Sequence, residues 1–229
     1  MMKSTEYKKR VLQDANLQLF EWWECQRSPY YFLTEWARTV DRHVVSSNPI
    51  QFFPKKEYIQ FVVDTWLKEK LLLIPKTRQM MMSWLFVGLY LWDAQFHPGR
   101  LIFFQSKKAE DANDLIARAK LIYDYQPDFL KSYSDSDGSK LVPMEAKCLS
   151  DKILFPQIHS ELRGIPEGGD IIRMHQASGI FSDEMGFQPS ARAAYIAAKP
   201  SLSSKGRFTG VSTAEDHSFF ENLVFDQID

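Results

Sequence analysis

Short apolar runs that alternate with longer proline-free segments constrain the fold of this chain more than any other feature. The runs Leu71–Ile74 and Leu101–Phe104 are each followed by a segment of helical length and composition, Ser83–Gln95 and Glu110–Tyr125. Strands separated by helices of this size predict parallel strands that are joined by crossover helices. We therefore expect a three-layer α/β fold, in which helices cover both faces of a mainly parallel sheet.

Four further apolar runs predict strands: Ile153–Phe155, Ile171–Met174, Gly179–Ser182 and Phe208–Val211. A helix over Tyr58–Lys68 is predicted to lead into the first strand. The polar stretch Ser132–Ser139 is rich in turn residues and predicts a solvated loop. With 229 residues and 45% hydrophobic content, the chain can bury one large core.

The first fifty residues predict a helical extension to this domain. Tyr7–Cys25 contains no proline or glycine and carries spaced apolar residues, which favours a single helix. A serine-proline start signal predicts a second helix over Tyr31–Val44, and turn residues at 46–49 end this part. We assign residues 1–50 to the extension and residues 51–229 to the α/β domain.

Charge and cysteine content exclude several classes of protein. The 28 basic and 29 acidic residues nearly cancel, so contact with nucleic acid requires a local basic patch rather than net charge. Cys25 and Cys148 show no spacing typical of a metal site or a disulfide framework. The apolar stretches are too short or too polar at their edges to span a bilayer, and the N-terminus is charged rather than signal-like. We expect a soluble cytoplasmic protein.

The run Gly179–Ser182 ends in two adjacent carboxylates, Asp183 and Glu184. If the run is a buried strand, both emerge at its carboxyl end. There, one can hold a magnesium ion and the other can orient a water for attack on a phosphate. The alternative is that the pair caps the N-terminus of a following helix.

The segment Lys76–Ser83 lies between the first predicted strand and the first crossover helix. In a standard phosphate-binding loop, G-x-x-x-x-G-K-[ST], glycines let backbone N–H groups approach the phosphates, and the lysine reaches the terminal ones. With its final serine aligned, Met81 takes the second glycine position and Met82 the lysine position. Lys76 and Arg78 are the candidates for the missing charge. The alternative is an ordinary strand-to-helix loop with solvated basic residues and core methionines.

Four segments occur in an order that resembles the ATPase domain of the large terminase subunit, the DNA-packaging motor of tailed bacteriophages. They are Lys76–Gln79 followed by Ser83, Ser160–Gly164, Phe181–Glu184 and Gly210–Thr213. The resemblance covers residues 52–213. It implies a three-layer P-loop NTPase of the ASCE, RecA-like type, with ATP and Mg²⁺ as cofactors. In that family the phosphate loop commonly departs from the standard pattern, although most members keep a glycine where this chain has Met81.

The resemblance also implies a role for each matching residue. Asp183 and Ser83 would hold Mg²⁺, and Glu184 would be the catalytic residue that positions the attacking water. Ser212 and Thr213 would form the coupling motif, which senses the γ-phosphate; a plain turn after a strand is the alternative. The ATP-binding loop would comprise Lys76, Thr77, Arg78, Gln79, Met80, Met81, Met82 and Ser83.

A ring ATPase of this kind needs an arginine that neutralises charge developing at the γ-phosphate. Arg163 resembles the family's candidate for an arginine finger supplied in trans. Arg173 is the runner-up and Arg78 is a candidate finger in cis, while a surface salt bridge is the alternative for Arg163. Adenine stacking is expected from Phe53 and Tyr58, for which core packing is an equally good explanation.

The resemblance implies that the chain works in a homo-oligomeric ring on the portal protein. Its other partners would be double-stranded DNA and the small terminase subunit, with no membrane, and its location would be the host cytoplasm. Translocation needs sequence-independent contacts with the DNA backbone. The candidate DNA contacts are Lys107, Lys108, Arg118 and Lys131, and for each of them a solvated charge is the alternative.

Two other functions stay open. A superfamily 2 helicase shares the strand and acidic pair but needs a second RecA-like domain in cis. A nonhydrolysing, nucleotide-gated scaffold would bind nucleotide without turnover because of Met81 and Met82. Full-length large terminases also carry a C-terminal nuclease with two metals. The sequence has no later acidic cluster of that kind, so we expect that domain to be absent from this chain and Glu221–Asp229 to begin the linker to it.

Overall fold

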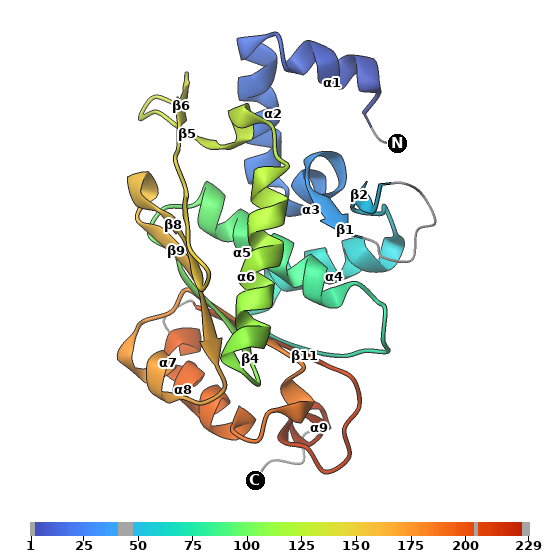
Figure 1. Cartoon of the computed structure of the whole chain (residues 1–229), viewed down its shortest axis with the longest axis vertical. Helices are drawn as coiled ribbons and strands as arrows, with labels where there is room; N and C mark the ends of the chain where they lie inside the picture. The colour runs from blue at the N-terminus through green and yellow to red at the C-terminus, as the bar shows by residue number, and fades with distance from the viewer. Residues whose placement is uncertain (1–2, 41–47, 204–205, 226–229) are drawn as a thin grey trace.

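The computed structural model describes residues 3–40, 48–203 and 206–225, and this part of the chain folds around a seven-stranded sheet with helices on both faces (Figure 1). The strands, in their order across the sheet, are β3 (Leu71–Pro75), β11 (Arg207–Ser212), β10 (Gly179–Asp183), β4 (Leu101–Ser106), β9 (Ser160–Pro166), β8 (Lys152–Phe155) and β7 (Lys147–Cys148). The first five are parallel, whereas β8 and β7 are added antiparallel. The expected three-layer, mainly parallel α/β fold is confirmed.

Two sets of helices bury the two faces of the sheet. One face packs against α4 (Glu57–Lys68), α5 (Met82–Phe96) and α6 (Ala109–Asp124), and the other against α7 (Asp170–Met174), α8 (Ala191–Ser203) and α9 (Phe219–Val224). Side chains alternate between these cores, because successive residues of a strand point to opposite faces. Phe104 and Phe181 lie in the first core, and their neighbours Phe103 and Ile180 lie in the second. Among the helices described, none has both the length and the apolar character needed to cross a membrane.

Strand β11 enters the sheet between β3 and β10, although it follows both of them in the chain. The registers bring three strand ends to one edge, since Ser212 pairs with Pro75 and Asp183 pairs with Val211. Loops that leave the carboxyl ends of neighbouring parallel strands lie close together, and ligands bind there in open α/β sheets. This order therefore places the loop after β3 beside the acids that end β10.

The N-terminal part contains two helices where the sequence predicted one. The single helix expected over Tyr7–Cys25 is wrong: α1 (Thr5–Val11) and α2 (Ala15–Arg27) are separated by a break. The carboxylate of Asp14 accepts hydrogen bonds from the N–H groups of Asn16 and Leu17 and starts α2 afresh. An acidic N-cap of this kind competes with continuation of the preceding helix.

The second predicted helix, Tyr31–Val44, is helical only as far as Trp36, and the strand that follows it corrects the rest of its described residues. A short helix α3 (Pro29–Tyr31) continues into the π-helix η1 (Phe32–Trp36), and the chain then forms strand β1 (Arg38–Val40). β1 pairs antiparallel with β2 (Ile50–Phe52), so the partner that makes it a strand lies beyond the reach of local sequence patterns. Residues 41–44 of this helix and 46–47 of the predicted loop lie outside the described residues.

Two further local predictions are corrected. The expected strand Ile171–Met174 belongs to α7, which follows two glycines and buries Ile172 against the second core. The expected loop Ser132–Ser139 instead begins with strand β5 (Ser132–Ser134), which pairs with β6 (Leu141–Pro143). Short apolar or polar runs do not distinguish helix from strand when a tertiary partner decides the outcome.

Gly179 begins β10 beside the ring of Tyr90. A Cβ at this position would lie 2.5 Å from that ring, and hydrogen bonds from the Tyr90 hydroxyl group to Ile180 (3.1 Å) and with Thr209 (2.9 Å) hold the ring in place. Overpacking of this kind costs about 1–3 kcal/mol. We expect Gly179→Ala to lower the free energy of unfolding in urea by that amount, while the exposed Ser136→Ala leaves it nearly unchanged. An unaltered free energy for Gly179→Ala would contradict the tight packing.

Candidate active site

The acidic pair lies at the carboxyl edge of the sheet, as the sequence predicted. Asp183 is the last residue of β10 and is 8% exposed. Glu184 follows with a φ of 48°, in the left-handed region, and turns the chain into the 3-10 helix η4 (Met185–Phe187). The side chain of Glu184 makes no capping hydrogen bond to that helix. Both carboxylates instead line one cavity.

Ser83 lies in the first turn of α5 and contacts the acid at the end of β10. Its Oγ donates a hydrogen bond of 2.9 Å to Oδ1 of Asp183, across 100 residues of chain. The N–H groups of the first helical turn have no partners within the helix, and the helix dipole favours negative charge there. The loop hydroxyl, the helix N-terminus and the buried acid therefore meet at one point.

The surroundings of Asp183 disfavour its negative charge. Burial raises the pKa of this carboxyl above its usual range, although the hydrogen bond from Ser83 opposes the rise. The charge of Glu184 raises the pKa further, whereas the charges of Arg118 and Lys76 lower it. Within the described residues, no cluster of three or more His, Cys, Asp or Glu side chains could hold a metal. One carboxylate and one hydroxyl instead fit Mg²⁺, which takes few protein ligands and completes its shell with water and phosphate oxygens.

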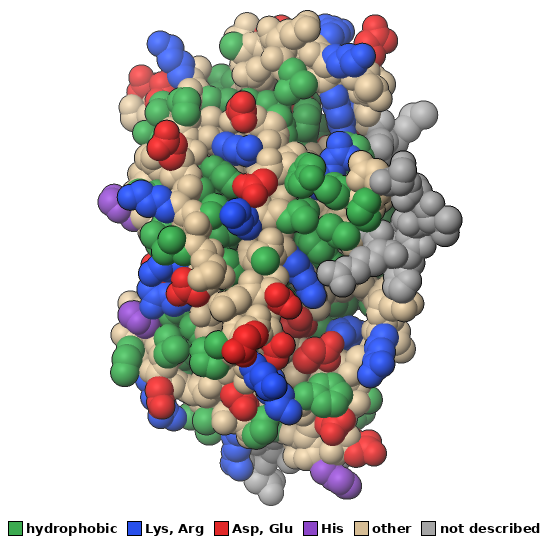
Figure 2. Space-filling model, viewed as in Figure 1, with side chains coloured by type: hydrophobic (Ala, Val, Ile, Leu, Met, Phe, Trp, Pro, Cys, Tyr) green, Lys and Arg blue, Asp and Glu red, His purple; other side chains and the backbone are tan. Residues whose placement is uncertain are grey.

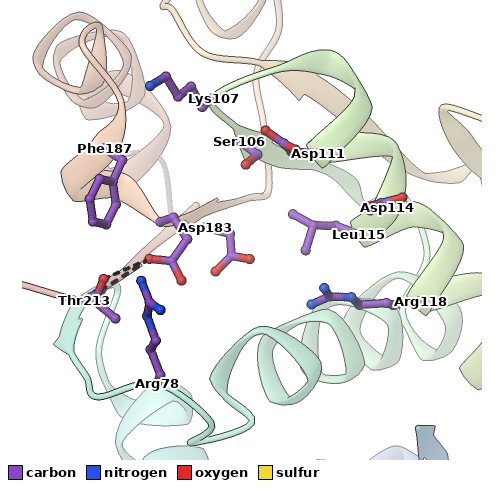
Figure 3. A pocket seen from close by; sticks show the side chains of 11 residues that line it. Arg78, Ser106, Lys107, Asp111, Asp114, Leu115, Arg118, Asp183, Phe187 and Thr213 are labelled. Atoms are coloured by element: carbon purple, nitrogen blue, oxygen red, sulfur yellow. Dashed lines mark hydrogen bonds between the residues drawn. The ribbon is translucent and has the colours of Figure 1, made fainter. Parts of the chain in front are cut away.

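Two neighbours hold Glu184. Lys76 Nζ lies 2.6 Å from Oε1 of Glu184. The backbone N–H and the Oγ1 of Thr213 approach Oε2 at 3.3 and 3.5 Å, shown as dashed lines in Figure 3. The side chain of Lys76 is 10% exposed and that of Glu184 is 41% exposed. The ammonium group is therefore largely buried, whereas the carboxylate is accessible to solvent.

Ser212 links the loop to the acidic turn. Its carbonyl accepts the N–H of Lys76 at 2.9 Å, and its Oγ accepts the N–H of Gly186 at 3.0 Å. A Cβ at Gly186 would lie 2.8 Å from that oxygen, so the close approach requires glycine. Gln188 was not among the predicted residues, yet its amide donates a hydrogen bond to the carbonyl of Asp183 at 2.8 Å and supports the end of β10. A single glutamine in a loop gives no sequence signal for such a role.

The loop between β3 and α5 contains two residues with left-handed backbone, Gln79 (φ 66°) and Met81 (φ 56°). Met81 immediately precedes α5, where the standard motif has a glycine. Glycine adopts this conformation freely, whereas another residue does so at a cost of about 1–2 kcal/mol. The loop therefore keeps the glycine-like backbone without the glycine. The remaining members divide between surface and core: Thr77, Arg78 and Gln79 are exposed, Met80 and Met81 are partly buried, and Met82 is buried.

A cavity of about 380 Å³ opens between the acidic pair and α6 (Figure 3). Arg78 extends toward the acids from the loop, and Arg118 extends from α6 on the opposite side. Lys107, Asp111 and Asp114 also line it. Figure 2 shows acidic and basic side chains interspersed over the N-terminal half of α6. Charges of both signs thus surround the space, as a site for a phosphate group and a cation requires.

A second cavity of about 790 Å³ shares Asp114 and Arg118 with the first. Its walls include Tyr58 and Trp84. The structure therefore brings Tyr58, but not Phe53, to the neighbourhood of the site. Phe53 is 1% exposed and packs in the first core beside Gly88 of α5.

The two arginines predicted as fingers in trans lie outside both cavities. Arg163, in β9, lies 2.7 Å from Glu161, and Arg173, in α7, lies 3.3 Å from Asp170. Each therefore has a carboxylate partner of its own within the chain. A role in the site of a neighbouring subunit remains a prediction for both.

Only two of the four predicted DNA contacts line either of the two cavities. Lys107 and Arg118 line the first cavity, whereas Lys108 and Lys131 line neither. A signal for Arg118 was present in the sequence, because Asp111, Asp114 and Arg118 recur at helical spacing and so share one face of α6.

Comparisons with known proteins place this fold. No protein-family model matches the chain, and no curated protein sequence was found to match it. Among solved structures, the large terminase ATPase domain of Thermus phage P74-26 aligns over 75% of this chain and 69% of that one, with a TM-score of 0.55 and 13% identity. A mutant of the same domain aligns over 75% and 70%, with a TM-score of 0.59 and 14% identity. The HK97 bacteriophage large terminase aligns over 88% of this chain and 40% of that one, with a TM-score of 0.62 and 13% identity. The chain therefore has the fold of the ATPase domain of phage large terminases.

Proposed function

We propose that this chain is an ATPase domain that hydrolyses ATP with Mg²⁺. The contact between Ser83 and Asp183 carries the proposal, because it joins the hydroxyl after the phosphate loop to the acid that ends a central strand. Phosphoryl transfer depends on positioned phosphates, a metal beside them and an oriented nucleophile. Ser83 and Asp183 would hold the metal, and Glu184 would orient the attacking water.

The phosphates are assigned to the start of α5 and to two basic side chains. N–H groups at a helix N-terminus bind anions, and Arg78 extends toward the same space (Figure 3). A bound triphosphate would compete with Glu184 for Lys76, which now lies 2.6 Å from the carboxylate. Once released from Lys76, Glu184 can accept a hydrogen bond from the attacking water. Mg²⁺, when bound, supplies neutralisation of charge on the phosphate oxygens.

We further propose that the domain drives translocation of double-stranded DNA into a procapsid. The likeness in fold to large terminases supports this role. A homo-oligomeric ring on a portal, the small terminase subunit and the host cytoplasm belong to the same proposal. Ser212 and Thr213 are the proposed coupling residues, because they contact both Lys76 and Glu184.

Steady-state ATP hydrolysis tests the proposed function. The assay uses the chain with and without Mg²⁺, over a wide range of protein concentration, in the presence and absence of double-stranded DNA. Mg²⁺-dependent turnover that rises faster than protein concentration would support a ring ATPase. Tight nucleotide binding without turnover at any concentration would favour the nonhydrolysing scaffold, and ATP-dependent strand separation would favour a helicase.

Arg163→Ala is expected to leave ATP binding unchanged and to abolish the rise of specific activity with protein concentration. A finger supplied in trans acts only after assembly, and its loss lowers turnover of the assembled enzyme by about 10³-fold or more. The control is Glu161→Ala, which removes the 2.7 Å ion pair but keeps the arginine, and which should preserve the rise. If Arg163→Ala retains the concentration dependence, Arg163 is not the finger and Arg173→Ala becomes the next variant to measure.

A further inference from the structure

Arg118 of α6 occupies the junction of the two cavities. It lines both, together with Asp114. Its guanidinium lies 5.5 Å from the centre of the Trp84 ring, and Trp84 belongs to the first turn of α5, next to Ser83. Figure 3 shows the side chain reaching from α6 into the space that Asp183 faces.

The guanidinium of Arg118 is positioned but not neutralised. Within the described residues, it forms no ion pair with a carboxylate, unlike Arg163 and Arg173. Asp114 lies one helical turn before it on the same face, yet the two side chains are not bridged. A guanidinium that packs on an aromatic ring is held in place, while its N–H groups stay available for an anion.

One cavity is lined by charged side chains and the other includes aromatic rings, which matches the phosphate part and the nucleoside part of a nucleotide. The first contains the proposed metal ligand Asp183 and the basic side chain of Arg78, which suit a phosphate chain. The second is larger, at about 790 Å³, and includes the aromatic rings of Tyr58 and Trp84, which suit a base and a sugar. A molecule that occupies both cavities passes beside the residue that they share, Arg118.

We propose that Arg118 binds the phosphate chain of a nucleoside triphosphate in cis, where the chain leaves the metal-binding end and the nucleoside enters the larger cavity. This role rests on the proposed ATP-binding function, and it replaces the DNA contact expected for Arg118. Asp183 and Glu184 line the first cavity but not the second, whereas Arg118 lines both. Arg118 therefore contacts the α- or β-phosphate, which ATP and ADP share, rather than the γ-phosphate.

Calorimetric titration of ATP, ADP and adenosine into the wild-type chain, Arg118→Ala, Arg118→Lys and Lys120→Ala tests this assignment. Loss of a charged hydrogen-bond donor should weaken ATP and ADP binding by about 10- to 100-fold and by similar factors. Adenosine, which has no phosphate, should bind the wild type and Arg118→Ala equally. Arg118→Lys should recover part of the affinity because it keeps the charge. Lys120 is exposed on the same helix and lines neither cavity, so Lys120→Ala should bind like the wild type.

The outcomes separate this inference from the proposed function. If the wild-type chain binds neither ATP nor ADP, the proposed function fails and Arg118 has no nucleotide to bind. If the wild type binds both and Arg118→Ala binds both equally well, the inference is overturned while the proposed function stands. A loss confined to ATP would place Arg118 at the γ-phosphate and contradict the assignment. Unchanged nucleotide binding with weakened binding of double-stranded DNA would return Arg118 to the DNA surface.

Discussion

Replacing Glu184 with glutamine is expected to slow ATP hydrolysis by about 10²- to 10⁴-fold, the loss that follows removal of a positioned general base. Glutamine keeps the length of the side chain and an oxygen that can accept the hydrogen bonds from Thr213. It loses the negative charge that we propose orients the attacking water and that pairs with Lys76 at 2.6 Å. Because Lys76 is then free to reach a phosphate, ATP should bind at least as tightly as to the wild type. Single-turnover hydrolysis and equilibrium binding of ATP measure the two effects separately.

A matched control for this substitution lies close by. Glu215 is exposed, follows Thr213 by two residues and lines neither cavity, so Glu215→Gln should leave both hydrolysis and binding unaltered. Hydrolysis at the wild-type rate by Glu184→Gln would remove Glu184 from the mechanism. Parallel loss of hydrolysis and binding would mean instead that Glu184 serves mainly to hold the loop through Lys76.

Asp183→Asn is expected to lower Mg²⁺-dependent turnover strongly and, at the same time, to stabilise the nucleotide-free protein. Loss of a fixed charge at the metal should lower turnover by about 10²- to 10³-fold, comparable with the removal of other electrostatic groups from active sites. Stability should rise because burial raises the pKa of Asp183, which means that the folded state disfavours the ionised carboxylate. The amide oxygen of asparagine can still accept the hydrogen bond from Ser83. Opposite effects on stability and activity are common at functional sites.

The direction of this pKa shift also fixes how the stabilisation depends on pH. A carboxyl whose pKa is higher in the folded than in the unfolded chain, where it is about 3.9, binds its proton more tightly when folded. Its contribution to stability is therefore greatest at acid pH and is lost as the pH rises through the folded-state pKa. Asparagine does not titrate, so the advantage of Asp183→Asn should be small near pH 4 and larger near pH 7, measured by urea unfolding without Mg²⁺. If Asp183→Asn were less stable than the wild type near pH 7, the inference that the folded state disfavours the ionised carboxylate of Asp183 would be wrong.

The central architecture was predictable because its signals are local. Compact apolar runs marked β3, β4, β10 and β11, and proline-free segments marked α5 and α6, so the crossover pattern followed from spacing alone. The meeting of Ser83 with Asp183 agrees with what the resemblance to terminase ATPase domains implied for these two residues. Element spacing alone did not give it, because β3 and β10 are separated in the sheet by β11, which follows both in the chain.

The errors lie where a distant partner decides local structure. Residues 38–40 form a strand because residues 50–52 pair with them. The sequence pattern within 31–40 does not predict that pairing. The approach of Arg118 to Trp84 and the cavities was likewise not predicted, because it depends on how α6 packs against α5. Packing of this kind is a property of the assembled layers rather than of either helix.

The end of β11 serves as a common reference point for both halves of the proposed site. Ser212 bonds to the first residue of the loop and to the turn after Glu184, and Thr213 bonds to the glutamate itself. Lys76 and Glu184 are separated by 108 residues of chain, but their relative position is set by only two hydrogen-bonded strand pairs, β3 with β11 and β11 with β10. A shift of β11 by one residue would move Ser212 and Thr213 away from both the loop and Glu184. The geometry of the proposed site therefore depends on the register of this one strand.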